Sequence, residues 1–128
     1  PVLNEGKPAR QLDLTEEEEL AVKALGLLTR KPIIYAANVS EDDLATGNAW
    51  VDQVKALATE ENAQVVIISA QVESELVELP EDERADFLES LGVTEGGLKA
   101  LIQAPYTLLG LQTYLTTGPK ETRAWTIK

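Results

Sequence analysis

Two unbroken runs of β-prone residues constrain the fold of this chain more than any other feature. The first is Ile33–Asn38 and the second is Gln64–Ala70, and between them apolar residues recur at helical spacing from Trp50 to Glu60. Strands without polar alternation are typical of a parallel sheet covered by helices, and a parallel pair needs a helical crossover of this kind. We therefore predict an α/β fold containing a right-handed βαβ unit.

A further helix is predicted ahead of the first strand, from Thr15 to Arg30. Thr15 can act as its N-cap and Glu18 follows at the spacing of a capping box. The acidic residues of the first turn and the basic residues near the far end match the helix dipole. This segment follows a stretch, Pro1–Leu14, that we expect to be a connecting loop or the end of an extended arm.

Three more helices are predicted after Ala70. The first ends before Pro80, the second begins at Pro80 and stops at Gly92, and the third is capped by Thr94 and ends at Gly110.

The end of the chain changes character and predicts a β-hairpin. Leu111–Thr116 and Thr122–Ile127 are β-prone, and Thr117–Glu121 between them contains a Gly-Pro turn.

Composition excludes several kinds of chemistry. Acidic residues outnumber basic ones by 22 to 11, and the net charge of −11 would repel a phosphate backbone, so this segment is not expected to bind nucleic acid directly. The absence of cysteine and histidine removes disulfides, thiolate metal sites and histidine general bases.

The longest apolar runs are far too short for a membrane span, so we expect a cytoplasmic protein. Because no methionine occurs, we expect the chain to be a piece of something longer.

Ligands of open α/β sheets bind outside the carboxyl ends of the strands, which directs attention to Asn38–Glu41 and Ser69–Gln71. The carboxamide of Asn38 offers one donor and one acceptor, which match N7 and the N6 amino group of adenine. The backbone N–H of Ala70 could donate to a purine or simply cap a helix. On these residues alone, an ordinary turn with a helix cap explains Asn38–Glu41 at least as well.

Other conspicuous residues are interpreted without a functional role. Consecutive acids at Glu41-Asp42-Asp43 are more typical of a solvated surface than of a metal site. Trp50 and Trp125 each lie on an amphipathic pattern and are predicted to be packed instead of stacking on bases. We assign no catalytic residue and no metal ligand.

The strand ending in Asn-x-x-acid and the strand ending in Ser-Ala resemble the two base-recognition motifs of P-loop GTPases. With Leu111–Tyr114 and the stretch Thr-Gly-Pro-x-Glu-x-Arg-Ala-Trp-Thr-Ile at Thr117–Ile127, essentially the whole chain resembles the YchF or Obg-like ATPase family. The resemblance implies a fragment of a P-loop NTPase parallel sheet, with two strands and flanking helices. Residues 1–30 would end an inserted helical arm, residues 31–110 would form the C-terminal part of the G domain, and residues 111–128 would begin a TGS domain.

The same resemblance implies a parent protein that binds Mg²⁺ and nucleotide, hydrolyses ATP in preference to GTP and associates with ribosomes. The residues expected to contact the purine are Asn38, Val39, Glu41, Ser69 and Ala70. Glu41 replaces the aspartate that binds the N1–H and N2 amino groups of guanine in typical GTPases. Being longer, Glu41 can turn into solvent, which predicts a relaxed or reversed preference for guanine.

Neither Gly-x-x-x-x-Gly-Lys-Ser/Thr nor Asp-x-x-Gly occurs in the 128 residues. The groups that hold the β- and γ-phosphates and Mg²⁺ are therefore missing, and the isolated chain is not expected to hydrolyse nucleotide. Base contacts alone should bind no more tightly than about millimolar. The alternative is a non-enzymatic module that binds a protein or ribosomal partner through its hairpin and helices.

Overall fold

A computed structural model describes residues 2–128 of the chain. They form two compact units, the first ending at Ile33 and the second beginning at Ile34, and each is described separately. Within residues 2–128, none of the helices combines the length and the apolar character that crossing a membrane requires.

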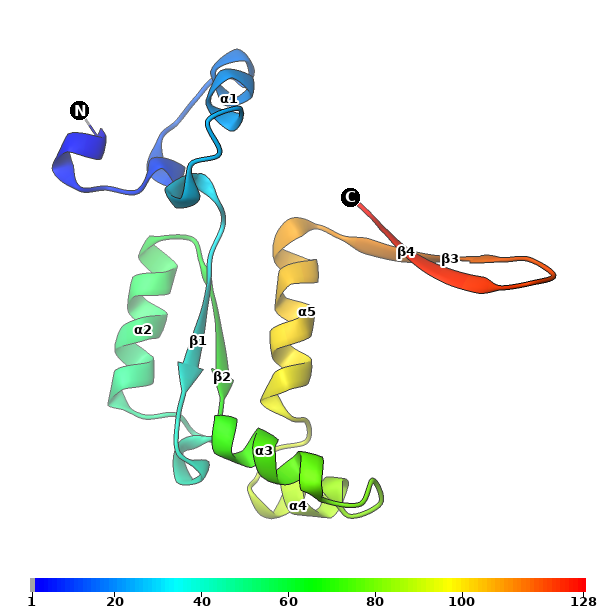
Figure 1. The fold of residues 1–128 in the computed structure, drawn as a ribbon. Coiled ribbons are helices and arrows are strands. Elements are labelled where there is room, and N and C mark those ends of the chain that lie inside the picture. Colours follow the sequence, from blue (N-terminus) through cyan, green and yellow to red (C-terminus); the bar gives the residue numbers. More distant parts are fainter. Residues whose placement is uncertain (1) are drawn as a thin grey trace. The chain divides into compact units, whose positions relative to one another are not determined.

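The second unit is built around a parallel pair of strands, β1 (Ile34–Asn38) and β2 (Gln64–Ile68), joined by helix α2 (Ala49–Glu60). The register runs from Ile34 opposite Gln64 to Asn38 opposite Ile68. Helix α2 covers one face of the pair and helix α5 (Gly97–Leu109) covers the other (Figure 1). The predicted α/β fold with a two-stranded parallel sheet and flanking helices is confirmed.

Part of the core of this unit lies at the carboxyl ends of the strands, where helices α3 (Ala70–Glu78) and α4 (Arg84–Ser90) are found (Figure 1). A buried cluster joins one residue of the loop after β1 to both helices, and its members are Leu44, Val72, Leu76 and Leu88. Val39 packs against the same cluster. Burial of these side chains therefore fixes the loop that follows β1.

Two of the predicted helix starts are wrong. Helix α4 begins at Arg84, because Pro80–Glu83 forms a turn in which the Glu83 N–H donates to the Pro80 carbonyl. Helix α5 begins at Gly97 and Thr94 does not cap it. Its N-terminus is capped from a distance by Glu73 of α3, whose Oε1 accepts from the Leu98 N–H at 3.1 Å.

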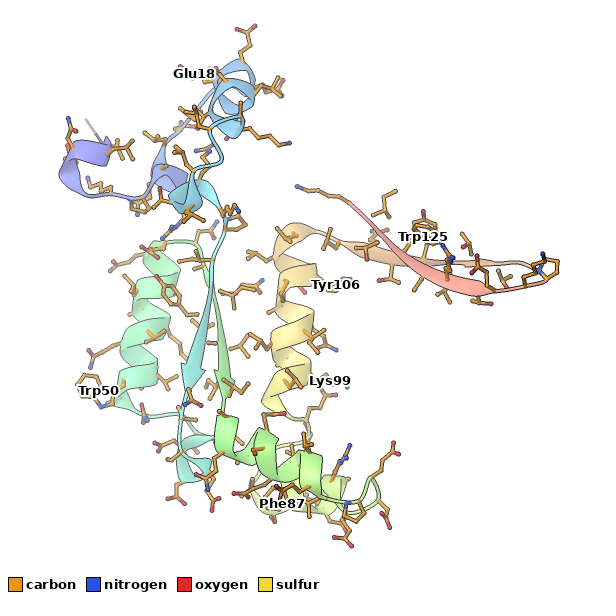
Figure 2. All side chains as sticks on the ribbon, viewed as in Figure 1. Glu18, Trp50, Phe87, Lys99, Tyr106 and Trp125 are labelled. Atoms are coloured by element: carbon orange, nitrogen blue, oxygen red, sulfur yellow. The ribbon has the colours of Figure 1, made fainter. Side chains whose placement is uncertain are left out.

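The predicted hairpin is confirmed as β3 (Gln112–Thr117) paired antiparallel with β4 (Thr122–Ile127). Tyr114 lies opposite Trp125, whose indole N–H donates to Thr116 Oγ1 at 2.8 Å. All residues of both strands are exposed. Figure 2 labels both tryptophans, and the prediction that they are packed is wrong: Trp50 is 75% exposed and Trp125 is 44% exposed.

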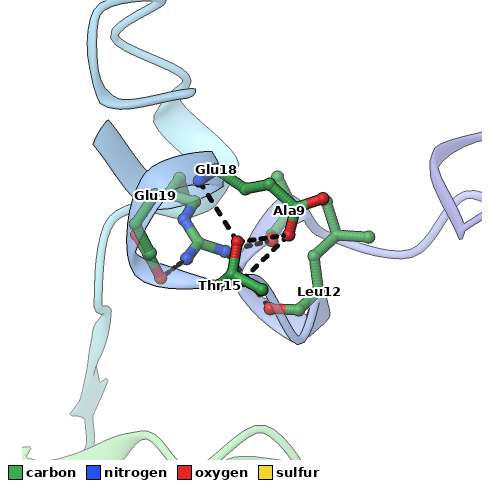
Figure 3. Close-up of polar contacts among 6 residues, drawn as sticks. Ala9, Leu12, Thr15, Glu18 and Glu19 are labelled. Carbon is green, nitrogen blue, oxygen red and sulfur yellow. Dashed lines mark hydrogen bonds and ion pairs between the residues drawn. The ribbon is translucent and has the colours of Figure 1, made fainter. Parts of the chain in front are cut away.

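The first unit contains helix α1 (Glu16–Lys23) and three short 3-10 turns, η1 (Val2–Glu5), η2 (Ala9–Gln11) and η3 (Leu28–Arg30). The predicted capping box is present, since the Thr15 side chain accepts from the Glu18 N–H and the Glu18 carboxylate accepts from the Thr15 N–H (Figure 3). The Glu18 carboxylate accepts from the Thr15 N–H and also from Thr15 Oγ1, and these two hydrogen bonds, the backbone one foremost, lower the pKa of Glu18 below its ordinary value.

Helix α1 is shorter than predicted, because it ends at Lys23 and not at Arg30. Gly26 adopts a left-handed conformation with φ of 60°, which breaks the helical path. Arg30 consequently turns back onto the preceding chain. Its guanidinium donates to the carbonyls of Ala9 and Leu12 at 3.0 and 3.3 Å and pairs with the Glu19 carboxylate.

Candidate base-recognition site

The two motifs singled out in the sequence meet at the carboxyl end of the sheet. Asn38 is the last residue of β1 and Ala70 is the first residue of α3. The Ala70 N–H donates to Asn38 Oδ1 at 2.9 Å, across 32 residues of sequence. One residue further on, the Val39 N–H donates to the Ile68 carbonyl at 2.9 Å. The ends of the two strands are therefore tied together by both backbone and side-chain hydrogen bonds.

Ser69 lies between these groups and is almost fully buried, with a relative exposure of 1%. It is the N-cap of α3, and its Oγ accepts from the Val72 N–H at 3.5 Å. The hydroxyl therefore faces the first turn of α3, the turn that begins at Ala70.

A pocket of about 300 Å³ adjoins the end of β1. This volume is at the lower end of the range, roughly 300–1,000 Å³, found for small-molecule sites. Its lining comes from the strand end, the following loop and the first turns of α2, namely Ala37, Asn38, Val39, Asn48, Trp50, Val51 and Val54. Two of the five predicted contact residues, Asn38 and Val39, thus line one concave surface.

The loop between β1 and α2 is held by a small polar network. Asp43 Oδ2 accepts from Ser40 Oγ at 3.2 Å and from Asn48 Nδ2 at 2.8 Å. Asn48 Oδ1 in turn caps α2 by accepting from the N–H groups of Trp50 and Val51, at 3.0 and 3.1 Å. Sequence reasoning missed Asp43 and Asn48, although an asparagine directly before an apolar helical pattern is an N-cap signal.

Glu41 begins the 3-10 turn η4 (Glu41–Asp43) and its side chain is exposed. Within the part of the chain that the structure describes, residues 2–128, no group of three or more acidic side chains is arranged to hold a metal ion.

Substitution of Asn48 tests how the loop is positioned. Asn48→Ala removes the cap of α2 and the contact with Asp43, and should lower the free energy of unfolding by about 1 kcal/mol, within a range of roughly 0.5–2 kcal/mol. Asn48→Ser keeps a capping oxygen and loses only the contact with Asp43, so its loss should be smaller. Urea denaturation of both variants measures the difference, and equal losses would contradict the capping role.

Comparison with known proteins identifies the family. No family model matches the chain. The ribosome-binding ATPase YchF of Bacillus subtilis is 52% identical over 124 residues, which are 95% of this chain and 34% of that protein. The chain belongs to the YchF and Obg-like ATPase family. Obg-like ATPase 1 of Caenorhabditis elegans is 38% identical over 130 residues, covering 98% of this chain and 32% of that protein.

A solved structure agrees with the YchF assignment. The YchF GTPase of Schizosaccharomyces pombe superimposes with a TM-score of 0.83 at 30% sequence identity, covering 98% of this chain and 34% of that one. The chain therefore spans about a third of the length of the YchF and Obg-like proteins it matches.

Proposed function

We propose that this chain is the base-recognition part of a longer, ribosome-associated ATP- and GTP-binding hydrolase of the YchF type. The observation that carries the proposal is the Asn38–Ala70 hydrogen bond, which brings the two candidate base-reading groups together at the carboxyl end of a parallel sheet. The ATPase activity and the ribosome as binding partner are proposed for the longer protein because the relatives' names state them. The share of their length that the chain covers supports its being one portion of such a protein.

The proposal assigns a place to each segment. Residues 1–30 end an inserted helical arm, residues 31–110 complete the nucleotide-binding domain, and residues 111–128 begin a TGS domain. Phosphate and Mg²⁺ would be held elsewhere in the longer protein, because no phosphate-loop motif occurs in these 128 residues. A ribosome-associated protein works in the cytoplasm, which is where we place it.

Within the site, we propose that Asn38 and the backbone at Val39 and Ala70 contact the purine, and that Ser69 positions the Ala70 amide. Glu41 is proposed to set the guanine preference. Its exposed side chain can point into solvent, so that no carboxylate opposes the N1 lone pair of adenine.

The test is nucleotide binding by the full-length protein that contains this segment. Titration calorimetry with ATP and with GTP should show binding of ATP at least as tight as that of GTP. Asn38→Ala should weaken ATP binding about 5- to 150-fold, because a bidentate amide–adenine pair contributes roughly 1–3 kcal/mol. A strong GTP preference would contradict the proposed role of Glu41, and no binding of either nucleotide would favour the non-enzymatic interaction module.

A further inference from the structure

Glu73 of α3 holds the start of helix α5. Its Oε1 accepts from the Leu98 N–H at 3.1 Å, across 25 residues of sequence. A Cβ added to Gly96 would lie 3.0 Å from Oε1 and 3.4 Å from Oε2, so the carboxylate lies directly against the residue before the helix. Gly96 is the N-cap of α5 and, being glycine, has no side chain with which to cap it. The first turn of α5 therefore depends on an acceptor that α3 provides.

A second contact fixes the same helix start to the end of strand β2. Gly97, the first residue of α5, is buried, and a Cβ there would lie 3.0 Å from Ile68 Cα. Ile68 comes shortly before Ala70 in the chain, and Glu73 comes one turn after it. The Ala70 amide thus lies in a short segment that contacts the start of α5 on both sides.

Helix α5 connects this segment to the β-hairpin. Its 13 residues form a rod about 20 Å long. The helix is closed by Gly110, whose φ is 64°, and the Leu111 N–H donates back to the Tyr106 carbonyl at 2.8 Å. Strand β3 begins at the next residue, Gln112. Only Gly110 and Leu111 separate the helix from the hairpin, so a change in the order of α5 reaches the hairpin through a very short connection.

We propose that Glu73 couples purine binding at Ala70 to the order of α5 and of its junction with the hairpin. The inference rests on the proposed base-recognition role of the site and adds a regulatory path to it. Glu73 is a positioning residue in this path, because it acts through the start of α5 and through the turn that carries Ala70.

The coupling follows from two arrangements of the first turn of α5. With Glu73 in contact, the segment from Ile68 to Glu73 is held on both sides and the Ala70 amide keeps its direction. Without this contact, α5 frays at its start and the turn that carries Ala70 loses one of its two supports. A purine that contacts the Ala70 amide therefore binds the capped arrangement more tightly and increases its population. By linkage, a change that favours the uncapped arrangement weakens purine binding.

Hydrogen exchange in the full-length protein that contains this segment measures the coupling at both ends of α5. Saturating ATP should slow exchange of the Leu98 amide, which donates to Glu73, and of the Leu111 amide at the hairpin junction, each about fivefold or more. Inorganic triphosphate carries no purine and should slow neither. Unchanged exchange at either amide with ATP overturns the proposal, as does an equal effect of triphosphate.

Substitution of Glu73 tests whether this residue carries the coupling. Glu73→Ala should abolish the slowing at Leu111 and weaken ATP binding, measured by titration calorimetry, about fivefold or more. Glu73→Gln keeps an oxygen that can accept from the Leu98 N–H and should retain both properties. Glu78→Ala removes an exposed carboxylate from the other end of α3, and as the matched control it should change neither.

If Glu73→Ala does not fold, Glu73→Asp serves instead, because its carboxylate is one methylene shorter and is drawn back from α5. A Glu73 that only stabilises the fold predicts unaltered ATP affinity and unaltered slowing at Leu111 in the variant, and that result overturns the proposal. A wild-type protein that binds neither ATP nor GTP rejects the proposed function, and the coupling with it. Binding of ATP without any response in α5 rejects the coupling alone.

Discussion

Leu44→Ala is expected to lower the free energy of unfolding by about 2–5 kcal/mol, as truncation of a buried leucine typically does. Leu44 is the one residue of the loop after β1 that enters the buried cluster with Val72, Leu76 and Leu88. Its truncation would leave a cavity between the loop and helices α3 and α4. Because the same loop lies between Asn38 and Asn48, the nucleotide affinity proposed for the full-length protein should fall together with stability.

Leu115→Ala is the matched control for this substitution. Leu115 lies in β3 and is 70% exposed, so removal of the same atoms should change stability by no more than about 0.5 kcal/mol. Urea denaturation gives both values. Similar losses in the two variants would show that the cluster at Leu44 does not anchor the loop.

The parts of the fold that the sequence predicts well are those set by neighbouring residues. The strands β1 and β2 follow from two uninterrupted apolar runs, and the hairpin follows from two β-prone runs around a Gly-Pro turn. The capping box at Thr15 and Glu18 is a three-residue pattern and is present as predicted. Local periodicity and local hydrogen bonding carry enough information for each of these features.

The wrongly predicted helix boundaries arise where a contact with a residue far away in the sequence determines where a helix begins or where the chain turns. Thr94 is a reasonable cap by sequence, yet Glu73 reaches the start of α5 from 25 residues away. The segment before Arg30 has a helical apolar pattern, but Gly26 ends the helix and Arg30 binds carbonyls of Ala9 and Leu12 instead. No pattern within a short window encodes such contacts.

The candidate site could likewise be predicted from the sequence only in part. The strand ends could be located from the sequence, because ligands of open α/β sheets bind there. The hydrogen bond from the Ala70 N–H to Asn38 could not be predicted. The sequence alone does not decide whether this N–H caps a helix or contacts a ligand. The network of Ser40, Asp43 and Asn48 depends on how the loop folds back on α2.

Gly97→Ala is expected to lower the free energy of unfolding by about 1–3 kcal/mol, the usual effect of overpacking. A Cβ at this position would lie 2.8 Å from Ile68 Cγ1 and 3.0 Å from Ile68 Cα, so the strand backbone itself would have to move. Alanine's better helix propensity, up to about 1 kcal/mol, offsets only part of this strain. Since Ile68 directly precedes Ser69 and Ala70, the displacement should also weaken the hydrogen bond to Asn38 and with it the proposed purine binding.

Gly118→Ala in the hairpin loop provides the comparison, because the nearest atom to its added Cβ would be 4.0 Å away. That substitution should be neutral or stabilise by up to about 1 kcal/mol, through the reduced freedom of the unfolded chain. Urea denaturation measures stability, and hydrogen exchange at the Ala70 amide reports on its bond to Asn38. Faster exchange is expected in Gly97→Ala and not in Gly118→Ala. Unchanged exchange at Ala70 in a destabilised Gly97→Ala variant would show that the contact of α5 with Ile68 supports the fold without positioning the site.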